Sequence, residues 1–416
     1  MHSLRINADR LWASLMEMAR IGATPKGGVR RLTLTGEDRQ ARDLFARWAR
    51  EAGCSIEVDA IGNIFARRAG TDPAAAPVAM GSHLDSQPSG GKFDGAYGVM
   101  AGLEVVRTLD DAGLRTRAPL EVVSWTNEEG SRFTPVMMGS GVFAGVFALE
   151  HARAQKDVEG RSAGEALDAI GYAGQARPHR LAAYLEAHIE QGPVLENERC
   201  TIGVVQGALG QRWYDVAVTG QDAHAGPTPM ALRQDALLGA SRLVQEVNRI
   251  AREFPDEARG TVGFMQVKPN SRNVIPGEVR TTVDFRNAKA ATLDAMCAAL
   301  ADAARRIESE CRVRIELREA TCFKPCEFDA GMVAAVRRSA SALGFRHRDI
   351  VSGAGHDAVY VARVAPTAMI FVPCEGGISH NETESATAAD LAAGCNVLLQ
   401  AALDKAGVAG EARAAA

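Results

Sequence analysis

Apolar positions in the first part of the chain alternate between helical and strand spacing. The segment Asn7–Arg20 carries Leu11, Leu15 and Met18 at helical intervals, and Asn7 stands where a helix cap is expected. A strand, a helix and another strand then follow, which predicts a parallel sheet with helices on its faces. In chain order, the expected elements are a strand pair at 55–67, a strand at 78–83, a helix at 95–112 and a strand at 120–125.

The middle of the chain has a different pattern, with helices set between amphipathic strands. Strands are expected at 213–219, 261–267, 279–285 and 313–317, and helices at 230–252 and 290–308. This βαββαβ order is ferredoxin-like. Beyond Phe328 the earlier pattern resumes, with a buried strand at 364–372. We therefore expect a split α/β domain of residues 1–212 and 328–416, with a mixed, largely parallel sheet and helices on both faces, interrupted by a ferredoxin-like α+β domain at 213–327.

Composition narrows the class of protein. The chain has 416 residues, of which 46% are apolar, and its net charge is −4. That mild acidity gives no support to a nucleic-acid or anionic-membrane partner. The charge-free stretch 133–149 contains several glycines and is too short to span a bilayer. The eight cysteines are scattered, without a pair at zinc-site spacing, so we expect reduced thiols in a cytoplasmic protein.

Polar side chains follow both predicted strands of the first half. His83 and Asp85 come at the end of one strand and lie on the same side of an extended chain, while Asp94 opens the next helix. Glu128 and Glu129 come after the other strand, and as neighbours they point in different directions. Functional residues of open α/β sheets gather beyond the carboxyl ends of strands, so these two clusters are candidates for one site.

Two further histidines stand in glycine-rich polar segments, His188 before Gln191-Gly192 and His380 after Gly376-Gly377. Together with the clusters above they supply three histidines and several carboxylates, a nitrogen and oxygen ligand set suited to zinc or manganese. Taken singly, a histidine beside an acid is more often a hydrogen-bonding residue, and a Glu-Glu pair is more often a solvated face. Spacing leaves open whether these residues converge.

The ordered set of motifs resembles the M20-type metal-dependent amidohydrolases. Within them it looks most like the amidase/hydantoinase/carbamoylase branch, which includes N-carbamoyl-L-amino-acid hydrolases, β-ureidopropionases and allantoate amidohydrolases. The resemblance extends from about residue 11 to 390. It is carried by His83-x-Asp85, Gly-Lys-Phe-Asp94-Gly, Asn-Glu128-Glu129-Gly, His188-Ile-Glu-Gln-Gly-Pro and Ser-His380-Asn-Glu.

The resemblance implies a dinuclear metal centre and an inserted domain that serves for dimerisation or as a lid. Asp94 would bridge two divalent ions, with His83 and His188 completing one site and Glu129 and His380 the other. Glu128 would be the general base, and Asp85 would orient His83 from behind. Zn²⁺ is the first choice for both ions, with Mn²⁺, Co²⁺ or Ni²⁺ as alternatives that histidine and carboxylate ligands also accept.

On the substrate side, the resemblance implies roles for Gln191, His224, Asn273, Arg286 and Gly355. The counterpart of His224 reaches into the partner subunit's active site of a homodimer and stabilises the developing oxyanion. Asn273 and Arg286 would hold the substrate carboxylate, for which a guanidinium fork is well suited. Without the resemblance, Arg286 is equally well read as an ordinary charge at a strand end.

Two further residues, which lie in or close to these motifs, are given no role in the site. His356 beside Asp357 is interpreted as supporting structure rather than as a substrate contact, and Arg212 is left unassigned.

The expected activity is hydrolysis of the ureido C–N bond of an N-carbamoyl amino acid to the amino acid, CO₂ and NH₃. N-carbamoyl-β-alanine is the first choice, which would place the protein in reductive pyrimidine breakdown. An N-carbamoyl-L-α-amino acid is second and allantoate third. A dinuclear-metal dipeptidase or aminopeptidase is a competing hypothesis. A non-catalytic binding protein ranks last because Glu128 and all the ligands are present.

Overall fold

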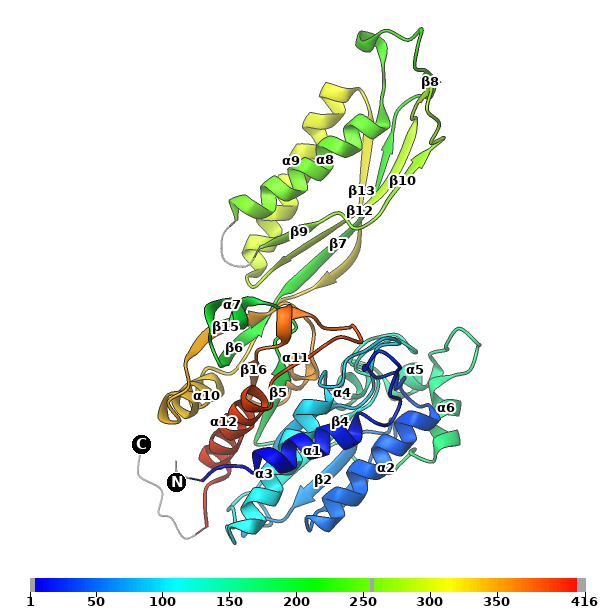
Figure 1. Cartoon of the computed structure of the whole chain (residues 1–416). Coiled ribbons are helices and arrows are strands. Elements are labelled where there is room, and N and C mark those ends of the chain that lie inside the picture. The colour runs from blue at the N-terminus through cyan, green and yellow to red at the C-terminus, as the bar shows by residue number, and fades with distance from the viewer. Residues whose placement is uncertain (1–3, 255–257, 410–416) are drawn as a thin grey trace. The chain divides into compact units, whose positions relative to one another are not determined.

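The computed structural model describes residues 4–254 and 258–409, which form two compact units (Figure 1). The first unit is discontinuous and contains 4–207 and 328–409, and the second is Ala208–Glu327. The second unit begins before the expected boundary at 213, because its first strand already starts at Gly210.

The first unit is built on a mixed sheet whose centre is parallel. Strands β4, β3, β5 and β16 run parallel in that spatial order, with β2 and β1 added antiparallel at one side and β6 antiparallel to β16 at the other. Strand β15 also pairs with β6. The bounds are β1 Ser55–Val58, β2 Ile64–Arg68, β3 Val78–His83, β4 Leu120–Trp125, β5 Ala183–Ile189, β6 Ile202–Ala208, β15 His347–Ser352 and β16 Thr367–Val372.

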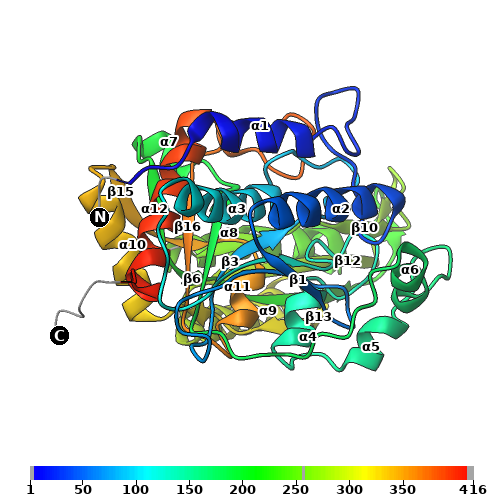
Figure 2. The ribbon, with the colours of Figure 1, turned by 90° about the horizontal axis from the view of Figure 1, so that it is seen from below.

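Helices cover both faces of this sheet. Figure 2 shows α1, α2 and α3 on one side and α4 and α11 on the other. The predicted cap of the first helix is confirmed, because the Asn7 side chain accepts a hydrogen bond from the Arg10 amide. The bounds are α1 Ala8–Met18, α2 Gly36–Glu51, α3 Ala96–Asp111, α4 Met138–Phe143, α5 Leu149–Ala154, α6 Ala163–Ile170, α7 Val194–Glu198, α10 Ala330–Ala342, α11 Asp357–Val361, the 3₁₀ turn η2 Glu375–Gly377, and α12 Ala388–Ala406.

Predictions for this unit hold best where an apolar run is unbroken. The strands expected at 78–83 and 120–125 and the hairpin within 55–67 are confirmed. The strand expected at 364–372 begins only at Thr367, because 361–365 completes a helical turn. Strand β5 was not anticipated, since Glu186 and His188 interrupt its apolar sequence although the whole strand is buried.

The second unit has a ferredoxin-like antiparallel sheet with the spatial order β10-β12-β7-β13, and β9 also pairs with β12. Helices α8 and α9 pack on one face, where they bury a common apolar core with the strands. The bounds are β7 Gly210–Thr219, β8 Ala223–His224, the 3₁₀ turn η1 Met230–Leu232, α8 Ala236–Glu253, β9 Arg259–Thr261, β10 Met265–Lys268, β11 Val274–Ile275, β12 Glu278–Asn287, α9 Ala290–Cys311, β13 Arg314–Phe323 and β14 Cys326–Glu327.

Three element predictions for this unit differ from the structure, and one of them is the strand expected at 313–317, which extends to Phe323. The helix expected at 230–252 begins at Ala236, because the Asp235 side chain caps it by accepting from the amides of Leu237 and Leu238. The apolar residues of η1 imitate helical spacing but are exposed. The strand expected at 261–267 is two strands, β9 and β10, which pair with different parts of β12.

Two features bear on the class of protein. Across the described ranges, the structure holds no helix with the length and apolarity that crossing a membrane requires. All eight cysteines are free thiols, and five of them are buried: Cys54, Cys200, Cys311, Cys374 and Cys395.

Candidate metal centre

The candidate site residues come from the carboxyl ends of neighbouring parallel strands. His83 is the last residue of β3 and lies opposite Trp125, the last residue of β4. His188 stands near the end of β5, opposite Phe371 of β16. Because parallel strands end at the same edge of a sheet, residues far apart in sequence meet there.

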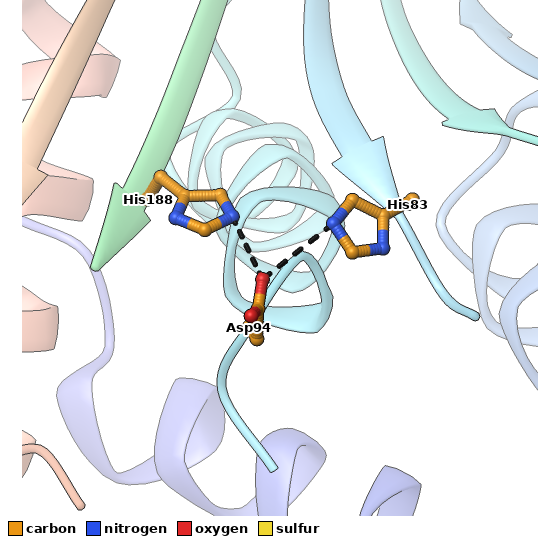
Figure 3. Close-up of side chains that lie close together, drawn as sticks. All are labelled: His83, Asp94 and His188. Carbon is orange, nitrogen blue, oxygen red and sulfur yellow. Dashed lines mark ion pairs between the residues drawn. The ribbon is translucent and has the colours of Figure 1, made fainter. Parts of the chain in front are cut away.

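His83, Asp94 and His188 form a buried group (Figure 3). The Oδ1 atom of Asp94 lies 3.1 Å from Nε2 of His188 and 3.6 Å from Nε2 of His83. Asp94 reaches this position from the turn that precedes α3, and Gly95 is the N-cap of that helix. Gly95 has φ +64°, and a Cβ there would overlap the His83 ring, so this position requires glycine.

The other carboxylate oxygen of Asp94 faces a second group, with Glu129 and His380. Nε2 of His380 lies 3.4 Å from Asp94 Oδ2 and 3.4 Å from Glu129 Oε2. The Gln87 side-chain amide donates to the same Glu129 oxygen at 2.7 Å. Asp94 therefore joins the two groups through its two oxygens, which is the arrangement of a bridging carboxylate.

The hydrogen bonds of the histidines indicate that a cation fits between these donors. Nδ1 of His83 lies 2.9 Å from the Asp85 carbonyl oxygen, and Nδ1 of His188 lies 2.8 Å from the Ile189 carbonyl oxygen. Each Nδ1 must therefore carry a proton, which leaves a lone pair on Nε2 of the neutral ring. Each lone pair faces Asp94 Oδ1, and that of His188 also accepts from the Gly95 amide at 3.2 Å. A shared cation, either a proton or a metal ion, would offset the repulsion between the facing nitrogen and oxygen acceptors. The donor types fit a divalent transition metal.

The pKa shifts of these residues also indicate that the group needs positive charge. Although burial opposes it, hydrogen bonds with His188 and His380 hold the pKa of Asp94 well below its usual value. The hydrogen bond with Asp94 raises the pKa of His380 to about 9. Burial, and next the Asp94 carboxylate, raise the pKa of Glu129 to about 7. Cations bound at this site would therefore stabilise the buried carboxylates, whose negative charges otherwise repel one another.

Glu128 lies beside the first group without belonging to it. Its Oε2 is 3.5 Å from Nε2 of His83, and the residue is buried. Burial raises the pKa of Glu128 well above its usual value, and the carboxylates of Asp357 and Glu129 add to the effect. A carboxylate adjacent to a ligand group but outside it can accept a proton from a bound reactant.

Asp85 orients its neighbours differently from the expectation. His83 is held by the main-chain carbonyl of Asp85, while the carboxylate is 3.8 Å from Nδ1 of His83. The two carboxylate oxygens instead accept from the backbone amides of Glu128 and Glu129, each at 3.3 Å. Asp85 therefore holds the segment after β4 against the end of β3.

Gln191 and Gly355 belong to the same unit as the metal-type groups. The Gln191 amide donates to Asp94 Oδ2 at 2.9 Å and lies 3.3 Å from the Ser379 hydroxyl. Gly355 is exposed beside the Met137 side chain. His356 is buried, bonds the Ser352 hydroxyl, and stacks edge-on against His188 at 4.6 Å between ring centroids. His356 thus packs against a candidate ligand histidine, and its supporting role stays a prediction.

His224, Asn273 and Arg286 lie in the second unit, and the structure brings only the first two together. Strand β8, which ends in His224, pairs with β11, and the Asn273 carbonyl accepts from the Ala225 amide. Both side chains are exposed. Arg286 stands eight residues beyond Glu278 on β12, so about 27 Å of extended strand separates it from the end of β12 that follows β11. One ligand cannot touch all three within a single unit.

The two arginines at this other end of the unit have partners. Arg286 pairs with Asp284 at 3.0 Å. Arg212, which the sequence left unassigned, pairs with Asp294 at 2.7 Å and Glu319 at 2.8 Å. These contacts explain Arg212 as part of a surface charge network.

Several polar residues that lie around the candidate ligands give no recognisable signal in the sequence. Gln87, four residues after His83, donates to Glu129 Oε2. Ser379 and Glu384 flank His380 and both hydrogen-bond toward Asp94 or its backbone. Glu186, two residues before His188, is buried and accepts from the Ser82 hydroxyl at 2.7 Å. Their roles depend on partners far away in the sequence.

Comparison with known proteins places these motifs in a family. Residues 79–404 match the peptidase family M20/M25/M40. An N-carbamoyl-L-amino-acid amidohydrolase of Rhizobium meliloti is 50% identical, with 97% of each chain covered. An allantoate amidohydrolase of Bacillus subtilis is 35% identical over 92% of this chain and 93% of its own. The crystal structure of an amidase of the hydantoinase/carbamoylase family from Burkholderia multivorans is 59% identical, with a TM-score of 0.95 over 97% of this chain and 99% of its own.

Proposed function

The chain belongs to peptidase family M20/M25/M40 and is an amidohydrolase, and from this we propose that it hydrolyses N-carbamoyl-L-α-amino acids. The reaction consumes one water: hydrolysis of one ureido C–N bond leaves a carbamate, and decomposition of that carbamate breaks the other C–N bond, so that the amino acid, CO₂ and NH₃ are formed. The observation that carries the proposal is the convergence of His83, Asp94 and His188 with Glu129 and His380 around the two oxygens of one carboxylate.

These five residues would hold two divalent ions, with Zn²⁺ the first choice and Mn²⁺, Co²⁺ or Ni²⁺ as alternatives. His83 and His188 would serve one ion, Glu129 and His380 the other, and Asp94 both. Two such ions supply positive charge that polarises the scissile carbonyl and makes water acidic.

Side chains of the protein then transfer the protons and orient the reacting groups. Glu128 takes a proton from the attacking water and returns it to the departing amine nitrogen, because its carboxylate lies beside the ligands without being tied to them. Asp85 accepts hydrogen bonds from the backbone amides of Glu128 and Glu129. It thereby fixes the backbone positions from which both glutamate side chains extend. Gln191 and Gly355 contribute to the substrate pocket on the same unit.

The names of the relatives favour a different substrate from N-carbamoyl-β-alanine, which was expected first. Relatives that are 50% and 40% identical are named for N-carbamoyl-L-amino acids, and the allantoate amidohydrolases are more distant at 35% and 34%. We therefore rank N-carbamoyl-L-α-amino acids first. N-carbamoyl-β-alanine, and with it a role in pyrimidine breakdown, stays a prediction to be tested beside allantoate.

Chelation and a substrate panel test the activity and the metal together. We expect a chelator to abolish ammonia release and added Zn²⁺, Mn²⁺, Co²⁺ or Ni²⁺ to restore it, because the ligand set would be empty without an ion. With the best ion, kcat/KM for N-carbamoyl-L-amino acids should exceed that for N-carbamoyl-β-alanine, which displaces the carboxylate by one methylene, by at least about tenfold. Ammonia release and metal content are measured on the same samples.

The panel also contains the D-enantiomers, allantoate and dipeptides. Faster turnover of dipeptides than of any ureide would replace the proposal by a dipeptidase. Activity that survives complete removal of bound metal would contradict the metal centre.

We propose further that the enzyme acts as a homodimer in which His224 of one subunit serves the site of the other. The resemblance suggests this exchange. It is supported by the exposure of His224 and Asn273, and by their position at the opposite end of the β12 strand from Arg286. His224 would stabilise the developing oxyanion, and Asn273 and Arg286 would hold the substrate carboxylate from two different subunits.

Mixing two inactive variants tests the exchange of His224. His224→Ala and Glu128→Gln should each be inactive alone, yet after dissociation and reassociation the mixture should regain about a quarter of wild-type activity. Half of the dimers would then be mixed, and each would hold one site with both residues intact. Light scattering establishes the dimer independently. If the mixture stays inactive while mixed dimers are detected, His224 acts within its own chain.

A further inference from the structure

Glu384 is a buried carboxylate that holds the backbone of Asp94. It lies on the loop between β16 and α12, four residues after His380, and is 2% exposed. Its Oε1 accepts from the backbone amide of Phe93 at 3.0 Å and from that of Asp94 at 3.1 Å. Glu384 therefore binds the turn that delivers Asp94 from a segment about 290 residues away in the sequence.

The second oxygen of Glu384 connects the same turn to the loop of His380. Its Oε2 accepts from the Ser379 hydroxyl at 2.8 Å, and that hydroxyl is also 3.1 Å from Asp94 Oδ2. Ser379 directly precedes His380, so a single carboxylate contacts both the turn of Asp94 and the residue before His380. These two ligands belong to the same proposed metal group.

Close backbone packing leaves Glu384 little freedom. A Cβ at Gly91 would overlap the Glu384 carboxylate, so the loop before Asp94 lies directly against it. Gly28 packs against the Glu382 backbone in the same loop. By contrast, the Glu382 side chain is partly exposed and pairs with the exposed Lys26 at 3.6 Å, away from Asp94.

We propose that Glu384 is a positioning residue of the dinuclear centre, which sets the Asp94 carboxylate and His380 at the separation that a shared ion requires. The inference rests on the proposed function, because it concerns ligands of that metal centre. Outer contacts of this kind orient ligand side chains before an ion arrives, and their loss typically costs 10–100-fold in metal affinity or activity.

Glu384→Ala, Glu384→Gln and the neighbouring control Glu382→Gln test the role. Mn²⁺ affinity is measured by competition with a chelating dye, and kcat and KM are measured at saturating Mn²⁺. We expect Glu384→Ala to bind Mn²⁺ about 10–100-fold more weakly and to lose kcat at saturating metal with little change in KM. Glu384→Gln should recover most of the affinity, since its amide oxygen still accepts from the amides of Phe93 and Asp94. Glu382→Gln should match the wild type.

Ser379→Ala covers the case in which Glu384→Ala does not fold. It removes the hydroxyl and with it the contacts to Glu384, Asp94 and Gln191, and it is expected to weaken Mn²⁺ binding about tenfold. Wild-type Mn²⁺ affinity and kcat in Glu384→Ala, or in both Glu384→Gln and Ser379→Ala if Glu384→Ala is unfolded, would overturn the role of Glu384. A wild-type protein that binds no divalent ion and hydrolyses no ureide would overturn the proposed function itself.

Discussion

Replacement of Glu128 by Gln is expected to lower kcat for the preferred N-carbamoyl amino acid by about 10²–10⁴-fold. The amide has nearly the shape of the carboxylate but cannot take a proton from water at neutral pH. Because Glu128 stands beside His83 and outside the two candidate ligand groups, the variant should bind as much metal as the wild type. The measurement is initial-rate kinetics on protein of known metal content.

Glu129→Gln is the informative control, since it changes the adjacent carboxylate. Glu129 contacts His380 at 3.4 Å, so its replacement should weaken binding of one ion as well as lowering kcat. Added metal should then restore part of its activity but none of that of Glu128→Gln. If Glu128→Gln turns over ureides at the wild-type rate with metal bound, another group is the base.

Arg42→Met is expected to lower the free energy of unfolding by about 3–5 kcal/mol, because it strands a buried carboxylate. Arg42 and Asp38 are both buried on α2, with Nε 2.8 Å from Oδ2. The guanidinium also donates to the Gly62 carbonyl at 2.7 Å and to the Thr126 hydroxyl at 3.2 Å. Arg42 thus links the helix to the segment that leads into Glu128. Urea unfolding followed by circular dichroism measures the loss.

The same helix provides a matched control for this ion pair. Arg39 and Asp43 are also four residues apart, at 3.7 Å, but both are exposed. Arg39→Met should change stability by less than about 1 kcal/mol. Combining Arg42→Met with Asp38→Asn should recover part of the loss, because the stranded charge is then gone. Equal effects of the Arg39 and Arg42 variants would mean that the buried pair contributes nothing beyond a surface pair.

The pattern of apolar residues predicted elements well where burial is uniform. Strands β3 and β4 are buried along their whole length, and their bounds match the prediction. Strand β5 is equally buried but carries Glu186 and His188, whose partners belong to other segments. The periodic spacing of apolar residues indicates which positions are buried. A strand that buries polar side chains against partners far away in the sequence therefore gives no clear signal.

Capping side chains also determine where helices begin, which the spacing of apolar residues alone does not reveal. Asn7 was recognised as a cap because it directly precedes its helix. Asp235 was overlooked, because exposed apolar residues before it continue the helical spacing.

By itself, the sequence determined which side chains are available for chemistry and the strand ends that carry them. His83, Asp94, Glu128, Glu129 and His380 were all nominated from types and neighbours. Only the tertiary structure decided how they contact one another: that Asp94 faces both groups, that Asp85 holds the His83 ring through its main-chain carbonyl while its carboxylate accepts from backbone amides, and that Glu384 holds the turn of Asp94. The physical reason is that hydrogen bonds and close packing act over a few ångströms in space, whereas the residues that they join lie up to about 290 positions apart in the chain.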